Sequence, residues 1–297
     1  NYRANVSPPT NYSAWGLIVK QFAEHLVQRF GVDEIATNWP FEVWNEPNTE
    51  PTGFWTGSQD DYFHLYAEAA HAIKSVSPRL RVGGPVTCAN AAWITDLRGF
   101  CELHHVPLDF ISTHTYTGDW QGVNDVSKVL SVWEEARAAA GHLPILITEF
   151  GSTYKSGRVN QSLGTCHDNF EASSFLARAY LAAIDSPTAD LELLSYWAVS
   201  DVFEEGGFPA NNASFSGDFG LVNIYGIPKP GYRMLQLMHS MGTSRLPTQH
   251  HSAGAGPCKT TVGSFAAVDN STGENTIVVF NQAARGLPIE ACQVTLT

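Results

Sequence analysis

The sequence predicts an α/β protein built as a (β/α)8 TIM barrel, followed by part of a small antiparallel β domain. Apolar, strand-like runs alternate with single amphipathic helices over residues 1–245, which is the pattern of βαβ units in a parallel sheet. The runs are short and end in polar residues, as barrel strands do where they meet an active site. No run leads into G-x-G-x-x-G or a Walker loop, so a doubly wound nucleotide-binding sheet is disfavoured.

Helical segments are recognised by the spacing of their apolar residues. We expect helices over residues 13–30, 60–76, 93–104, 126–140, 170–184 and 232–241. In the first of them Ser13 is the expected N-cap, and Gly31 is the expected stop.

Apolar runs between these helices predict the strands, over residues 41–44, 80–85, 108–116, 144–150 and 191–199. The first run ends abruptly in Asn45, Glu46, Pro47 and Asn48. Asn and Glu are poor strand formers, and proline has no N–H to donate to a central ladder. A strand therefore stops here with a carboxylate at its end.

The composition changes near residue 246, where a stretch rich in Ser, Thr, Gly and Ala begins. Alternating runs over residues 264–268, 276–280 and 293–296 then predict antiparallel strands. We therefore expect two domains, the barrel portion over 1–245 and the start of a β-sandwich over 246–297.

Charge and hydropathy exclude several classes of partner. The 297 residues carry a formal net charge of -12 with Lys and Arg scattered, which disfavours nucleic acid and anionic membrane surfaces. No apolar run reaches the roughly 18 residues that a membrane span needs. Composition leaves the oligomeric state open.

Glycosylation sequons and cysteines favour an extracellular location. Five Asn-X-Ser/Thr sequons occur, at Asn5, Asn11, Asn160, Asn212 and Asn270. Of the five cysteines, Cys258 and Cys292 lie in the same terminal segment and are candidates for a disulfide, although spacing alone does not establish connectivity. We expect a secreted glycoprotein.

Polar side chains gather where the predicted strands end, and in a barrel these ends face one bowl. They are Asn45, Glu46, His114, Tyr116, Glu149, Trp197, Glu204 and Glu205. Paired carboxylates that flank a bond are what glycoside hydrolysis requires. Each residue alone has a structural explanation, such as a solvated loop glutamate or a buried histidine, and the joint pattern is more specific. We expect neither a metal nor a cofactor at this site.

Several segments together resemble glycoside hydrolase family 39, of the clan that places its acid/base and its nucleophile at the ends of barrel strands four and seven. They read FEVWNEPN, RLRVGGPVT, VPLDFISTHTYTGD, PILITEF and YWAVSDVFEE. Within that family the chain looks most like the β-xylosidases. The resemblance runs from about Asn5 to about Arg233.

The resemblance implies roles for the clustered side chains. Glu46 would be the general acid/base and Glu149 the nucleophile, with Asn45 on the 2-hydroxyl of the sugar. His114 and Tyr116 would line the first subsite, where Tyr116 is placed to bond the nucleophile. Trp197 would form the sugar platform, and Glu204 and Glu205 would receive ring hydroxyls.

The resemblance also implies that this chain supplies barrel strands four to eight, and that strands one to three are missing before Asn5. A retaining β-xylosidase acting at the non-reducing ends of xylo-oligosaccharides is the leading interpretation, with carboxyl groups roughly 5–5.5 Å apart. An α-L-iduronidase-like glycosidase and a non-catalytic carbohydrate-binding relic remain as alternatives.

Overall fold

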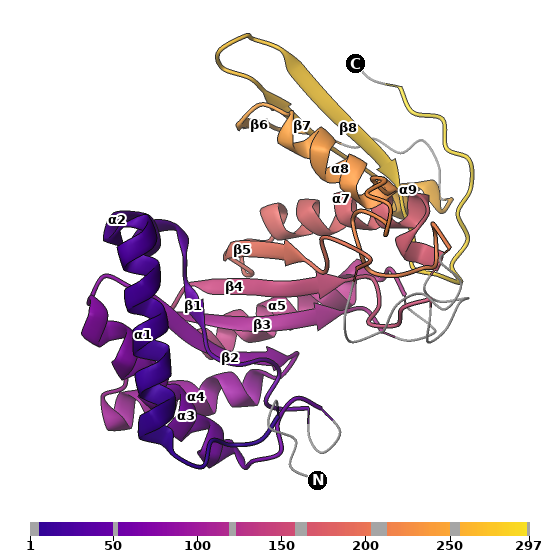
Figure 1. Cartoon of the computed structure of the whole chain (residues 1–297). Coiled ribbons are helices and arrows are strands. Elements are labelled where there is room, and N and C mark those ends of the chain that lie inside the picture. Colours follow the sequence, from indigo (N-terminus) through magenta and orange to yellow (C-terminus); the bar gives the residue numbers. More distant parts are fainter. Residues whose placement is uncertain are drawn as a thin grey trace. The chain divides into compact units, whose positions relative to one another are not determined.

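The computed structural model describes residues 6–49, 53–118, 123–157, 165–202, 213–249 and 256–295 (Figure 1). The chain divides into two compact units. The first consists of residues 1–115, 132–149 and 188–195, and the second of residues 116–131, 150–187 and 196–297.

A five-stranded sheet runs through the described chain in the order β1-β2-β3-β4-β5 (Figure 1). Its strands are β1 (Phe41–Glu42), β2 (Val82–Cys88), β3 (Phe110–Tyr116), β4 (Ile145–Gly151) and β5 (Leu191–Tyr196). The pairs β1–β2 and β2–β3 are parallel, and the strand order follows the chain order. The prediction of barrel strands connected by helices is therefore confirmed, and the strands' carboxyl ends share one edge.

The helices follow the predicted pattern with small shifts at their ends. They are α1 (Tyr12–Phe30), α2 (Val32–Asn38), α3 (Gln59–Val76), α4 (Ala91–His104), α5 (Val126–Ala140), α7 (Phe170–Asp185), α8 (Pro230–His239) and α9 (Cys258–Thr261), with a 3₁₀ turn η1 (Thr165–His167). The expected N-cap Ser13 is wrong, because the Asn11 side chain accepts the Ala14 N–H at 3.0 Å. Helix α2 was missed because only Gly31, at φ +88°, separates it from α1.

Aromatic side chains of the first unit hold the end of β1 in place. Trp44 packs edge-on against Trp55 with ring centroids 5.1 Å apart, and its indole N–H donates to the Phe54 carbonyl. From α3, the buried Tyr62 hydroxyl donates to the Val43 carbonyl at 3.0 Å. The two residues before the polar loop are thus fixed, so the loop starts from a rigid point.

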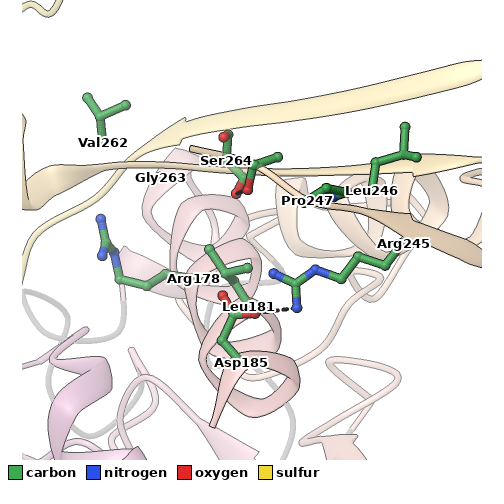
Figure 2. Close-up of a pocket in the computed structure, with 10 residues that line it drawn as sticks. Arg178, Leu181, Asp185, Arg245, Leu246, Pro247, Val262, Gly263 and Ser264 are labelled. Atoms are coloured by element: carbon green, nitrogen blue, oxygen red, sulfur yellow. Dashed lines mark hydrogen bonds and ion pairs between the residues drawn. The ribbon is translucent and has the colours of Figure 1, made fainter. Parts of the chain in front are cut away.

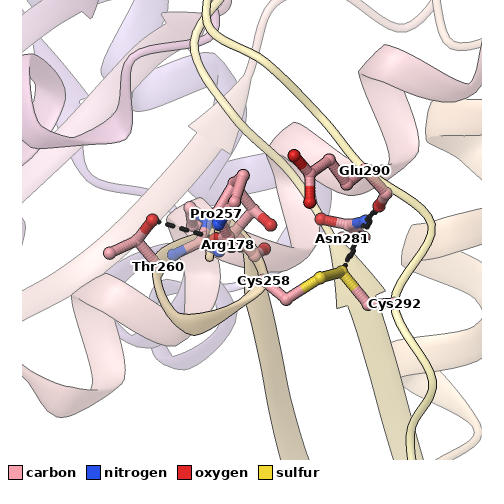
Figure 3. Close-up of a disulfide and its surroundings, with 8 residues drawn as sticks. Arg178, Pro257, Cys258, Thr260, Asn281, Glu290 and Cys292 are labelled. Atoms are coloured by element: carbon pink, nitrogen blue, oxygen red, sulfur yellow. Dashed lines mark hydrogen bonds between the residues drawn. A yellow bond between two sulfur atoms is a disulfide. The ribbon is translucent and has the colours of Figure 1, made fainter. Parts of the chain in front are cut away.

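The second unit contains a separate antiparallel sheet of β6 (Ser244–Leu246), β7 (Val262–Val268) and β8 (Asn275–Asn281). Two of its strands were predicted, but the third expected run is wrong, because residues 293–295 form no strand. A disulfide between Cys292 and Cys258 holds this segment instead, and the Asn281 amide donates to the Glu290 carbonyl (Figure 3). The candidate pair Cys258 and Cys292 is thus bonded in the structure, and the domain boundary between residues 245 and 246 stays a prediction.

Among the described helices, none is both long enough and apolar enough to cross a membrane.

Candidate active site

The loop after β1 holds Glu46 against the end of β2. The Glu46 N–H donates to the Val86 carbonyl at 2.9 Å, and Glu46 adopts a φ of +42°, a region that non-glycine residues rarely occupy. Asn48 reinforces this position by accepting the Cys88 N–H at 2.8 Å and donating to the Cys88 carbonyl at 3.1 Å. The polar run that ends the first strand therefore has a structural cause, since it clamps a carboxylate above the neighbouring strand.

Three of the predicted site residues meet within the first unit. His114 lies on β3 and Glu149 on β4. The Nδ1 atom of His114 lies 2.9 Å from Oε1 of Glu46 and 3.4 Å from Oε2 of Glu149. One oxygen of each carboxylate and one nitrogen of the imidazole lie within 4.8 Å of one another. The side chains are 3% exposed for His114, 11% for Glu46 and 14% for Glu149.

The shared imidazole connects the two carboxylates. In the form in which both acids are ionised they only accept hydrogen bonds, and the Nδ1 atom of His114 is then the donor toward each of them. Burial is the largest influence on the pKa of His114 and lowers it. The hydrogen bond to Glu46 and the negative charges of Glu149, Glu46 and Glu42 outweigh burial, and the net pKa is raised above its ordinary value. The site therefore favours a positive charge between its acids.

Cys88 belongs to the same site, although the sequence did not single it out. Its backbone pairs in register with His114 across β2 and β3, and its thiol is close enough to Glu46 and Glu149 for their charges to act on its pKa. Burial raises the pKa of the Cys88 thiol to about 12, and the charges of Glu46 and Glu149 add to this effect. The thiol thus stays protonated.

The remaining predicted residues are distributed differently. Asn45 directly precedes Glu46 and is half-buried. Tyr116 and Trp197 belong to the second unit. There the Tyr116 ring packs edge-on against Tyr154, with ring centroids 6.2 Å apart. The backbone N–H of Trp197 donates to the Phe150 carbonyl. Glu204 and Glu205 lie outside the described residues.

A separate pocket of about 640 Å³ lies in the second unit between α7 and the β6–β7 strands (Figure 2). Its charged lining includes Arg178, Arg245 and Asp185, and the last two form an ion pair. Arg178 instead donates to the Thr261 carbonyl and lies over the Phe280 ring, 5.1 Å from its centroid. The lining contains none of the predicted site residues.

The chemistry available to the site follows from the spacing of its carboxylates. One oxygen of each carboxylate lies within 4.8 Å of the other, which leaves little room for a water between them. Inverting glycosidases keep their carboxyl groups about 6.5–9.5 Å apart to make that room. One acid can attack a carbon while the other protonates an oxygen on it. Paired carboxylates at the ends of parallel strands are the arrangement that glycoside hydrolases with a (β/α)8 barrel use.

Comparison with known proteins gives the family. The description "Glycosyl hydrolases family 39" matches residues 1–297, and the chain belongs to this family.

Individual relatives agree with this family. A β-xylosidase of Caldicellulosiruptor saccharolyticus is 38% identical over 262 residues, which cover 83% of this chain and 50% of that protein. A β-xylosidase of Geobacillus stearothermophilus is 36% identical over 265 residues, covering 82% and 49%. The crystal structure of a monomeric β-xylosidase from Caulobacter crescentus CB15 superposes with a TM-score of 0.74 at 31% identity, over 90% of this chain and 52% of that one. The chain thus spans about half the length of these relatives.

Proposed function

We propose that the protein is a retaining glycosidase that releases xylose from the non-reducing ends of β-xylosides, as part of a catalytic (β/α)8 barrel. The observation that carries the proposal is the convergence of Glu46 and Glu149 on His114. The similarity to two β-xylosidases supports the choice of sugar. A uronic acid substrate is less suited, since its carboxylate would face two acids here.

In the proposed first step, a carboxylate oxygen of Glu149 attacks the anomeric carbon of the xylosyl unit. The glycosidic C–O bond breaks, and Glu46 gives its proton to the leaving oxygen. His114 donates its Nδ1 hydrogen toward both carboxylates and holds them in position. The product is a covalent xylosyl ester on Glu149.

In the second step, Glu46 acts as a carboxylate and takes a proton from water. The water oxygen attacks the anomeric carbon, and the ester bond to Glu149 breaks. Two inversions restore the original configuration. Asn45 would hold the sugar 2-hydroxyl.

The test is trapping of the intermediate. The full chain is incubated with a 2-deoxy-2-fluoro-xyloside bearing a good leaving group, and intact mass and peptide mapping follow. One adduct per chain on the peptide carrying Glu149 is expected, and none in Glu149→Gln. Glu42→Gln is a matched control from the same sheet, because Glu42 accepts from Thr148 rather than from His114. Label on another residue, or unchanged labelling of Glu149→Gln, contradicts the assignment.

We further propose that the protein is secreted and glycosylated. A disulfide joins Cys258 to Cys292, and disulfides persist in oxidising compartments. Among the sequons, Asn11 and Asn270 are exposed. Glycosylation of Asn11 on its nitrogen leaves the oxygen free to cap α1. A mass decrease on deglycosylation of protein recovered from the medium of its native host, smaller in the Asn11→Ser and Asn270→Ser double variant, is the expected result.

A further inference from the structure

The carboxylate–imidazole cluster has a second chemical capacity. Glu46, His114 and Glu149 come from the ends of three different strands, yet each offers one ligand-type atom, and these atoms lie within 4.8 Å of one another. We propose that this cluster, together with Cys88, binds one transition-metal dication of the Zn²⁺ class. The bound ion occupies the place of the sugar's reacting carbon and blocks the site.

The spacing of the atoms fits such an ion. Bonds of about 2.0–2.2 Å from Zn²⁺ to nitrogen or oxygen in a tetrahedron place ligand atoms about 3.3–3.6 Å apart. The Nδ1 atom of His114 lies 2.9 Å from Glu46 and 3.4 Å from Glu149, and the two carboxylate oxygens are within 4.8 Å of each other. Small side-chain rotations therefore complete the geometry. The ion would replace the hydrogen that Nδ1 now shares between the two acids.

Cys88 would supply a fourth ligand of a different kind by turning its sulfur toward these three atoms, since that sulfur is not among the atoms that lie within 4.8 Å of one another. Cys88 pairs with His114 in the β2–β3 register, and its thiol is close enough to Glu46 and Glu149 for their charges to raise its pKa. Its backbone is fixed on both sides by the Asn48 amide. On metal binding the S–H bond would break, the proton would pass to the buffer and the sulfur would bind the cation.

The donor set selects among metals. Imidazole and thiolate favour Zn²⁺, Cu²⁺ or Co²⁺. Mg²⁺ and Ca²⁺ prefer oxygen ligands throughout. Both carboxylates are partly exposed, so the ion has access to the cluster without unfolding.

The first experiment measures binding directly and needs no turnover. Zinc retained by the full chain is quantified by equilibrium dialysis against ZnCl2 in chelator-free buffer, with MgCl2 as the comparison metal. One Zn²⁺ per chain is expected, with affinity reduced about tenfold or more in His114→Gln and in Glu149→Gln. His25→Gln, which removes an exposed histidine of α1, should retain the wild-type affinity. Absence of bound zinc, or equal affinity in His114→Gln and wild type, overturns the proposal.

The second experiment identifies the sulfur ligand. Co²⁺ added to the wild type should produce a sulfur-to-cobalt charge-transfer band in the near ultraviolet. The band should vanish in Cys88→Ser and persist in Cys101→Ser, which alters a buried cysteine of α4. Persistence of the band in Cys88→Ser overturns the assignment of Cys88.

The blocking effect rests on the proposed function, while metal binding does not. Zinc bound before the fluoro-xyloside is added should prevent labelling of Glu149, and removal of zinc by a chelator should restore it. Full labelling with zinc still bound overturns the claim that the ion occupies the sugar's place. Failure of labelling in metal-free protein would count against the glycosidase proposal and leave the dialysis result standing.

Discussion

The ammonium group of Lys229 lies 2.8 Å from the Asp201 carboxylate, and both side chains are almost completely buried. Lys229 also pairs with Asp168 at 2.6 Å and donates to the Asp218 carbonyl at 2.7 Å. Asp201 in turn accepts the Gly220 N–H. Lys229 directly precedes α8 and pairs with Asp168, which follows β4, and with Asp201, which follows β5. All three residues belong to the second unit.

Loss of this cation should destabilise the protein strongly. Lys229→Met leaves the Asp168 and Asp201 carboxylates without their cation in a buried place, and we expect a loss of about 3–5 kcal/mol in the free energy of unfolding. Urea denaturation followed by circular dichroism measures it. Lys20→Met is the matched control, because Lys20 and Glu24 are 43% exposed and 3.8 Å apart, and it should cost less than about 1 kcal/mol. Equal stability of the two variants would show that the buried pair is energetically neutral.

Replacing the proposed acid should affect substrates according to their leaving group. Glu46→Ala removes the proton donor, so hydrolysis of xylobiose should fall by about 10²–10⁴-fold in kcat/KM. An aryl β-xyloside with an acidic phenol needs little protonation, so formation of its glycosyl-enzyme should fall much less. Steady-state kinetics on both substrates, with a pre-steady-state burst for the aryl xyloside, checks this. An equal loss on both substrates would point to a role for Glu46 other than proton donation.

Much of this arrangement was readable in the sequence because its signals are local. Apolar periodicity located the parallel strands and most of the helices. Glu46 and Glu149 stood out because each follows an apolar run, and parallel strands bring their ends to one edge. His114 joined them for the same reason. Chain order alone was therefore enough to predict the three groups that meet.

Other features depend on contacts that periodicity does not encode. Cys88 comes to face His114 through a register that shifts between Pro85 and Thr87, and no pattern in the sequence signals such a bulge. The short strand Ser244–Leu246 is too brief to show alternation, so the third strand of the small sheet was sought at residues 293–296. The partners of Lys229 are distant in sequence and were not predicted.

A buried histidine should make stability depend on acidity. His167 is 2% exposed, and its ring packs edge-on against Phe219 with centroids 5.2 Å apart. Burial lowers the pKa of His167 from 6.5 to about 3, and the charge of Lys229 adds to the decrease. Between these values the unfolded chain binds a proton that the folded chain does not. The contribution of neutral His167 to the free energy of unfolding should therefore be complete above pH 6.5. It should decrease as the pH falls toward 3, by up to about 1.4 kcal/mol per pH unit.

Urea denaturation at intervals between pH 7 and pH 4 tests this prediction. His167→Phe keeps a ring in the same place but cannot titrate, so its stability should decrease less steeply with falling pH than that of the wild type. The slopes are compared, because the variant also loses the 3.4 Å contact to the Tyr196 hydroxyl and starts from a different stability. Parallel slopes would mean that His167 accepts a proton in the folded state.

The disulfide should contribute a large share of the stability of the small sheet. Cys258 and Cys292 are 34 residues apart, and the loop between them encloses β7 and β8. Closing a loop of this length restricts the unfolded chain by about 3–4 kcal/mol in the chain-entropy model. The Cys258→Ala and Cys292→Ala double variant should therefore melt at a lower temperature, as scanning calorimetry would show. Reduction of the wild type should raise its thiol count from three to five per chain and reproduce that decrease, while the variant should not respond to reductant. A wild type that reaches five thiols without any change in melting temperature would show that packing of the sheet, and not the covalent link, holds this segment.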